Sequence, residues 1–227
     1  DDELERERRV ILHEIADDED DPLTLAFQAF DRECFGAHPA GLPVIGKRAN
    51  IERFTRDDLL GYVQRQYSGA NVVVGVAGEV DAAAVLDAAE EAFGGLPQGE
   101  VNALAAPPWI GGIATRRLTG SSQTHVVIGW PIASLVDDDP AAIVAAAVLG
   151  EGMSSPLLDR IRERKGLAYY THCSADVLGL WGQFVVEASV APEHLDEFCT
   201  EVLALMRELA GGVGAVDLER ARNQLAV

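Results

Sequence analysis

Two carboxylates in the N-terminal segment, Glu7 and Glu14, have a spacing that could support chemistry. An α-helix turns once in about 3.6 residues, so a seven-residue step returns close to its starting direction and puts both on one face. Val10 and Ile11 lie along the same stripe and predict that this face meets a protein interior. A carboxylate there needs a cation, hydrogen-bond donors or a metal ion. The alternative is a solvated helix of mutually paired Glu and Arg side chains.

The composition narrows the classes of partner. The 227 residues include 18 Lys and Arg against 37 Asp and Glu, a formal net charge of −19. We therefore expect no nucleic-acid partner. No apolar run approaches the roughly 20 residues that cross a bilayer, so we expect no membrane partner either. The three cysteines are widely spaced, which predicts reduced, packed thiols and no disulfide framework.

The pattern of apolar, capping and turn residues predicts an α+β fold. Helices are expected at about 2–17, 23–35, 55–67, 81–93, 138–149, 156–166, 192–209 and from 216. Strands are expected at about 71–78, 114–118, 123–131, 167–177 and 180–190. The stretch at 94–112 is rich in Gly and Pro, which is the composition of a linker.

The order of these elements predicts two related domains, each a mainly antiparallel sheet packed with helices. The strand and helix at 71–93 are echoed at 182–206. We place the first domain at 1–96, the linker at 97–113 and the second domain at 114–227. Both ends of the chain fall inside helical patterns, so we expect the first domain to be truncated at its N-terminus and the second at its C-terminus.

Five segments, taken together in their order, carry a family resemblance. They are Glu5–Glu14, Phe35–Gly46, Asn71–Gly78, Gly152–Tyr169 and Glu219–Leu225. In this order they resemble the pitrilysin/insulinase family of zinc metallopeptidases, and most of all its two-domain bacterial subgroup, which is similar to mitochondrial processing peptidase. The resemblance covers nearly the whole chain.

The resemblance implies a zinc site to which this chain supplies one ligand. Family members hold zinc with two histidines of a His-x-x-Glu-His helix and with a distant Glu, and Glu14 matches that Glu. Glu7 matches a second carboxylate that supports the site from outside the ligand shell. The prediction depends on a Glu14 side chain that points inward, to where the metal ion would lie once the missing N-terminal part of the protein is present.

The histidine part of this motif is absent from the chain. Its five histidines include no pair with the His-x-x-x-His spacing. We therefore expect the other ligands upstream of residue 1, one zinc ion in each intact subunit, and neither zinc retention nor peptide hydrolysis by this chain alone. In the intact enzyme the resemblance implies attack of a zinc-activated water on a peptide carbonyl.

Arg162 and Tyr169 form a second candidate site. In the family, an Arg and a Tyr with this spacing bind the substrate backbone and help to polarise the scissile carbonyl. Gly166 is expected to end the helix and reverse the chain, which brings a strand residue back beside the helix. The alternative is that Arg162 belongs to a charged helix face and that Tyr169 is an ordinary strand aromatic.

Two functional classes remain open. The first is a fragment of a zinc-dependent endopeptidase that cleaves short or unfolded peptides. Since Glu14 falls in the first expected domain and Arg162 in the second, the resemblance implies an intact homodimer whose subunits complete each other's sites. The second class is a non-catalytic peptidase-like subunit that binds peptide or scaffolds an active partner. The resemblance places the protein in a bacterial cytoplasm or periplasm.

Overall fold

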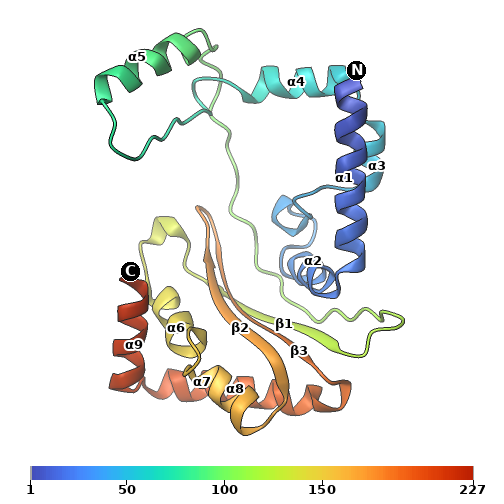
Figure 1. Ribbon diagram of the computed structural model, residues 1–227, viewed down its shortest axis with the longest axis vertical. Helices are drawn as coiled ribbons and strands as arrows, with labels where there is room; N and C mark the ends of the chain where they lie inside the picture. The colour runs from blue at the N-terminus through green and yellow to red at the C-terminus, as the bar shows by residue number, and fades with distance from the viewer. Residues whose placement is uncertain (1, 227) are drawn as a thin grey trace. The chain divides into compact units, whose positions relative to one another are not determined.

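The computed structural model describes residues 2–226, which group into two compact units (Figure 1). One unit consists of the described residues up to Ile15 together with Ile45–Ala105. The other consists of Ala16–Val44 together with the residues from Ala106 onward. The second unit thus contains residues 16–44, which the sequence analysis assigned to the first domain.

The first unit is built from helices and extended segments. Its helices are the start of α1 (Asp2–Asp20), α3 (Arg48–Arg53), α4 (Arg56–Gln66) and α5 (Ala82–Phe93). Arg8 of α1 donates hydrogen bonds to the main-chain carbonyls of Ile51 and Phe54, which ties α1 to α3. Helix α4 begins with a reciprocal capping box between Thr55 and Asp58, as the sequence predicts.

The strand expected at 71–78 is not formed. Ser68 and Asn71 lie beside residues 97–102, and Asn71 donates a side-chain hydrogen bond of 2.9 Å to the carbonyl oxygen of Glu100. The residues that follow are extended but have no ladder partner among the described residues, and Val73 is 95% exposed. A strand needs a neighbour for its backbone hydrogen bonds, so the valine-rich run alone was an insufficient signal. The strand expected at 114–118 is likewise absent. The segment 71–93 therefore resembles 182–206 in its helix but not in its strand.

The second unit contains a three-stranded antiparallel sheet with helices, which confirms an α+β fold. Its strands are β1 (Thr124–Ile132), β2 (Ala168–Val177) and β3 (Gly182–Val190), in the order β1-β3-β2. Its helices are α2 (Pro22–Phe35), α6 (Ala141–Gly150), α7 (Pro156–Leu158), α8 (Leu195–Gly211) and α9 (Ala215–Leu225). Short turns of helix are η1 (Pro39–Gly41), η2 (Leu135–Asp137), η3 (Asp159–Arg164) and η4 (Pro192–His194).

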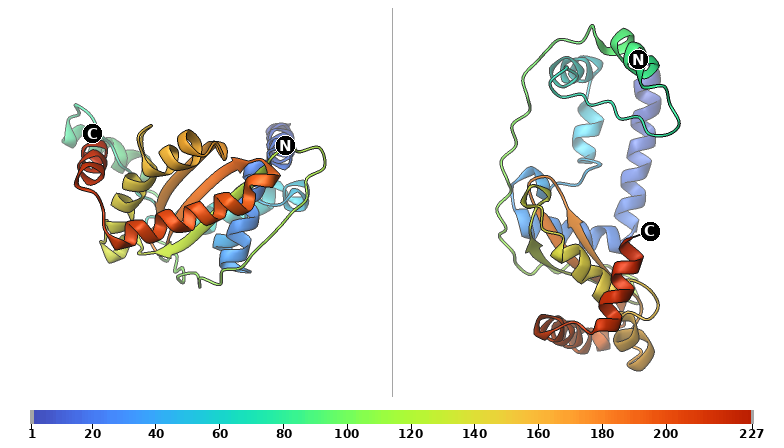
Figure 2. Two further views of the ribbon diagram at one scale, coloured as in Figure 1. Left: turned by 90° about the horizontal axis from the view of Figure 1, so that it is seen from below. Right: turned by 90° about the vertical axis from the view of Figure 1, so that its left-hand side faces the viewer.

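Helices α6 and α8 pack with one face of this sheet (Figures 1 and 2). Alternate residues of β3, among them Val186 and Ala188, point into this core and are fully buried. Phe198 and Val202 of α8 meet them and are also fully buried. Each large side chain removed from water in this way contributes about 1.5–3 kcal/mol to folding.

Helix α2 packs against β1 through aromatic rings. A side chain at Gly129 of β1 would collide with the ring of Phe30, so the glycine permits the close approach. Phe35, at the end of α2, is 2% exposed and makes edge-to-face contacts with Trp109 and Trp181 at centroid distances of 5.6 and 4.6 Å. These contacts explain why residues 16–44 belong to the second unit.

Two expectations from composition can be compared with the structure. All three cysteines are free; Cys34 and Cys173 are buried and Cys199 is partly buried, as predicted. Within residues 2–226, none of the helices combines the length and apolar character needed to cross a membrane.

Candidate functional site

Arg162 and Tyr169 are brought together by the fold of the second unit. The guanidinium carbon of Arg162 lies 4.9 Å from the centre of the Tyr169 ring, within cation–π range. The Tyr169 side chain is 80% exposed, and the Arg162 side chain is 33% exposed. The pair is therefore accessible to a ligand from solvent.

Arg162 lies in a widened helical turn. The helix starts as predicted, with the Ser155 side chain accepting from the amide of Leu158 and with a proline at the first turn. From Asp159 to Arg164 the chain then adopts π-helical geometry, η3. Such turns hold an extra residue, re-aim their side chains and occur often at functional sites. Gly166 follows with φ of 62° and reverses the chain, as the sequence predicts.

Tyr169 lies at a β-bulge on the other side of this turn. Ala168 pairs with Val190, but the next pair is Tyr170 with Ser189, so Tyr169 is an extra residue on β2. A bulge leaves its extra residue outside the ladder and redirects its side chain. Here the redirected ring meets the Arg162 guanidinium. Two backbone irregularities, one on each side of Gly166, thus form the pair.

The chemistry available to this pair is that of peptide recognition. The Nε atom of Arg162 lies 3.4 Å from a carboxylate oxygen of Glu163. The guanidinium also lies against the ring of Tyr169, and this cation–π contact restricts its orientation. The pair can therefore present preoriented N–H and O–H donors to carbonyl oxygens of an extended chain.

Sequence reasoning missed a hydrogen-bonded group next to this pair. Glu187 of β3 is 8% exposed, and its carboxylate accepts a hydrogen bond from the hydroxyl of Tyr170. Its main-chain carbonyl accepts from the hydroxyl of Thr171 at 3.0 Å. Its Oε1 atom also lies 3.8 Å from Nδ1 of His172. A single charged residue inside a mostly apolar strand was the signal that could have indicated it.

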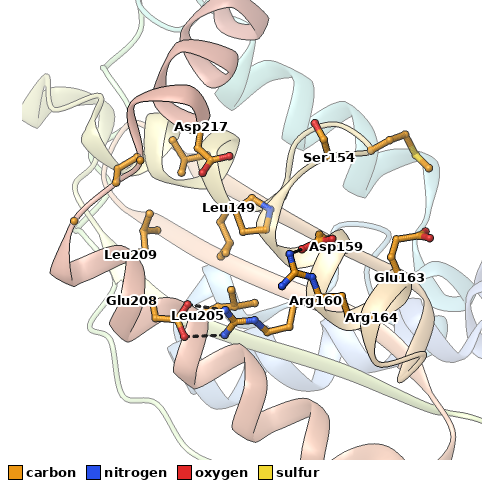
Figure 3. A pocket seen from close by; sticks show the side chains of 16 residues that line it. Leu149, Ser154, Asp159, Arg160, Glu163, Arg164, Leu205, Glu208, Leu209 and Asp217 are labelled. Carbon is orange, nitrogen blue, oxygen red and sulfur yellow. Dashed lines mark hydrogen bonds and ion pairs between the residues drawn. The ribbon is translucent and has the colours of Figure 1, made fainter.

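A cavity of about 640 Å³ lies elsewhere in this unit, between α6, η3, α8 and α9 (Figure 3). Two ion pairs line it: both Nη atoms of Arg160 bind the Glu208 carboxylate at 2.8 and 2.7 Å, and Arg164 lies 2.7 Å from Asp159. Its cationic groups are thus already paired with carboxylates. Neither Arg162 nor Tyr169 lines this cavity, so it is not part of the candidate site.

Glu7 and Glu14 lie on α1, as expected, but both are exposed. Val10, which was expected to turn this face toward an interior, is 44% exposed. Among the described residues, Glu7, Val10 and Glu14 are thus not buried, and an inward-pointing Glu14 stays a prediction for a longer protein. Within residues 2–226, no three His, Cys, Asp or Glu side chains are grouped so that they could hold a metal ion.

Comparison with known proteins identifies the family. The sequence profile described as the peptidase M16 inactive domain matches residues 53–225, most of the chain. The chain belongs to the peptidase M16 family. The resemblance stated from the sequence is thereby confirmed.

Other proteins are similar to this M16 chain in sequence or in fold. A protein named uncharacterized zinc protease from Rickettsia bellii is 32% identical over 225 residues, which are 98% of this chain and 54% of the relative. A protein of similar name from Mycobacterium leprae is 32% identical over 237 residues, 99% of this chain and 52% of the relative. The crystal structure of a peptidase M16 inactive domain from Pseudomonas fluorescens has a TM-score of 0.87 at 23% identity, over 99% of this chain and 56% of that one. The chain thus spans about half the length of these relatives.

This M16 chain also contains a buried carboxylate away from the Arg162–Tyr169 pair. Oδ1 of Asp31, on α2, is buried without a hydrogen-bond partner among the described residues. Burial raises the pKa of Asp31 to about 6, and the negative charge of Asp176 adds to the rise, while a hydrogen bond from Gln183 opposes it. Gln183 also donates to Asp176 at 3.3 Å. The native state therefore binds a proton at Asp31 more tightly than the unfolded chain does.

We expect Asp31→Asn to stabilise the chain at pH 7.5 by about 1 kcal/mol, a figure reduced for partial solvent screening. With a raised native pKa, the contribution of Asp31 is complete below its unfolded value of 3.8 and is lost as pH rises through about 6. The advantage of the variant should therefore vanish toward pH 4. Urea unfolding between pH 4.5 and 8 measures it. Asp87→Asn, at an exposed position of α5, should change stability little at any of these pH values; an equal effect there would contradict the assignment.

Proposed function

We propose that this chain is part of a zinc-dependent endopeptidase and that its second unit binds the peptide substrate through Arg162 and Tyr169. The observation that carries the proposal is the cation–π contact of these two exposed residues, formed by a π-helical turn and a β-bulge. Membership in a peptidase family and the zinc protease names of its relatives support it. The substrates would be short or unfolded peptides. Only an extended backbone leaves its carbonyl groups free to accept hydrogen bonds from the side chains of Arg162 and Tyr169.

The zinc site itself is not built by the described residues. Glu14 is exposed, and no grouped donors accompany it within residues 2–226. We therefore assign this chain no step that passes through the metal. A ligand role for Glu14 and a supporting role for Glu7 remain predictions for a longer protein that also supplies histidines. A homodimer whose subunits complete each other's sites likewise remains a proposal.

The second candidate function is a non-catalytic subunit that binds peptide or scaffolds an active partner. The description of the matching profile as an inactive domain favours this possibility for the part of the chain that it covers. An endopeptidase and a peptide-binding subunit would both use Arg162 and Tyr169, whereas a subunit that only scaffolds an active partner would not need them. The two candidate functions differ in whether the longer protein carries a His-x-x-Glu-His helix, which the sequence of the whole gene would show.

The test is peptide binding by the 227-residue chain. We expect a fluorescein-labelled, unstructured peptide to bind, and Arg162→Ala to weaken its affinity about tenfold, because charge-assisted hydrogen bonds contribute about 1.5–3 kcal/mol each. Fluorescence anisotropy measures the affinity directly. Tyr169→Phe should retain the cation–π contact and lose only the hydroxyl, so its loss of affinity should be smaller than that of Tyr169→Ala.

The matched control is Arg164→Ala. Arg164 lies in the same turn, is 72% exposed on its side chain and pairs with Asp159. This change removes the same charge from the same region, so it should leave peptide affinity within about twofold, as expected of an exposed ion pair. Equal losses of peptide affinity for Arg162→Ala and Arg164→Ala would mean that the peptide responds only to the positive charge of this region. That result would refute a specific site.

A further inference from the structure

The position of Tyr169 depends on what holds β2 in place directly after the bulge. The segment before Tyr169 is fixed by the buried residues Leu167 and Ala168 and by a 2.8 Å hydrogen bond from the amide of Leu167 to the carbonyl of Ile161. A bulged residue lies outside the ladder, so its direction is set by the residues on both sides. The downstream side therefore needs its own anchor.

Tyr170 and Thr171 provide that anchor, and both hold the same partner. The hydroxyl of Tyr170 donates to the carboxylate of Glu187, and the hydroxyl of Thr171 donates to its main-chain carbonyl. Glu187 pairs with Val127 of β1 and with His172 of β2, so it lies on the central strand with a neighbour on each side. Two consecutive residues of β2 are thus tied by their side chains to one residue of the most restrained strand.

We propose that Glu187 is a positioning residue for peptide binding, which acts by holding Tyr170, and through it the bulge, so that the Tyr169 ring stays against the Arg162 guanidinium. This inference rests on the peptide-binding function proposed above. Glu187 would not contact the peptide, since its side chain is only 10% exposed and its Oε1 atom is already engaged.

The hydrogen bond between Tyr170 and Glu187 can anchor β2 over the ordinary pH range. Burial of the hydroxyl, with the hydrogen bond to Glu187 and its negative charge, raises the pKa of Tyr170 to about 12. The phenol therefore remains a donor throughout the ordinary pH range. Nδ1 of His172, at 3.8 Å from Oε1, is too far away to replace it as a hydrogen-bond donor.

The decisive experiment is a double-mutant cycle on the 227-residue chain, with the labelled peptide and anisotropy assay. We expect Tyr170→Phe to weaken peptide binding about fivefold, as for one lost hydrogen bond, and to have no further effect in a Tyr169→Ala background, because it acts through Tyr169. Additive losses in the double variant would overturn the inference. Full affinity in Tyr170→Phe alone, with loss in Tyr169→Ala, would also overturn it.

Three companion variants separate positioning from general destabilisation. Glu187→Gln keeps an acceptor oxygen for the Tyr170 hydroxyl, so its affinity should stay within about twofold of wild type, while Glu187→Ala should match Tyr170→Phe. His172 lies on the same strand and face as Tyr170 but its side chain makes no hydrogen bond to Glu187, so His172→Ala should bind the peptide normally. A loss in Glu187→Gln equal to that in Glu187→Ala, or a loss in His172→Ala, would contradict the role of the hydrogen bond.

Hydrogen exchange distinguishes failure of this inference from failure of the proposed function. Without peptide, the amides of residues 168–171 should exchange faster in Tyr170→Phe than in wild type, whereas those in the middle of β3 should not. If Tyr169→Ala leaves peptide affinity unchanged while this exchange increases, the peptide-binding function fails although the anchor exists. If exchange is unchanged, the anchor itself is refuted.

Discussion

Replacing Phe35 with alanine is expected to destabilise the second unit by about 3–4 kcal/mol, the usual loss for a buried phenylalanine. Phe35 is 2% exposed and joins three parts of the unit: α2, the segment at Trp109 and the strand connection at Trp181. The change would leave a cavity bounded by two rigid indole rings, which cannot easily collapse. Urea unfolding followed by tryptophan fluorescence measures the loss.

The control for this change is Phe93→Ala. Phe93 ends α5 in the first unit and is 46% exposed. Phe93→Ala should therefore lower the free energy of unfolding by about 1 kcal/mol or less, since little apolar area leaves a packed environment. If Phe35→Ala were equally mild, α2 would not be an integral part of the second unit.

A methyl group added at Gly150 is expected to lower the free energy of unfolding by about 2–3 kcal/mol, because its contact with Cys173 cannot relax without backbone movement. Gly150 ends α6 where the helix crosses β2, and a Cβ atom there would lie 2.4 Å from Cβ and 3.1 Å from the main-chain N of Cys173. Gly150→Ala should therefore lower the free energy of unfolding without changing the far-UV circular dichroism of the native state.

Gly211→Ala is the matched control, since Gly211 also ends a helix, α8. Apart from its chain neighbours and the nearby backbone of its own helix, no atom of residues 2–226 lies within 4 Å of a Cβ atom placed at Gly211. The same chemical change there should be neutral or should stabilise the chain by up to about 1 kcal/mol, through helix propensity and a less flexible unfolded state. Opposite signs for the two variants would demonstrate that close packing of α6 on β2, and not helix propensity, governs position 150.

The sequence predicted the second unit well because its signals are local. The Ser155-Pro156 cap, the turn at Gly166 and the alternating residues of β3 each specify their element from a few neighbouring residues. The strand predictions failed for residues 71–78 and, within the second unit, for 114–118, because a strand depends on a partner distant in sequence. Periodicity reports which residues could be buried, but it does not supply the neighbour.

The candidate site was predicted in its members and not in its geometry. The spacing of Arg162 and Tyr169 around Gly166 indicated that they could meet. The π-helical turn and the bulge that bring them together have no sequence signature in a single chain, because their surroundings are tertiary: Leu167 is buried in the core, and Tyr170 and Thr171 hydrogen-bond to Glu187 of another strand. Asp31 was missed because the residues that surround it, Gln183 and Asp176, are distant in sequence.

The two irregularities on either side of Gly166 have a consequence for how this segment tolerates change. A π-helical turn and a bulge each absorb one surplus residue, so η3 and the start of β2 accommodate both while Ile161 and Ala168 keep their places in the core. We therefore expect adding or deleting a single position at 163–165 to disturb the Arg162–Tyr169 contact more than exchanging residue types there, because a changed length rotates one partner away from the other. Natural variation here should preserve length more strictly than composition.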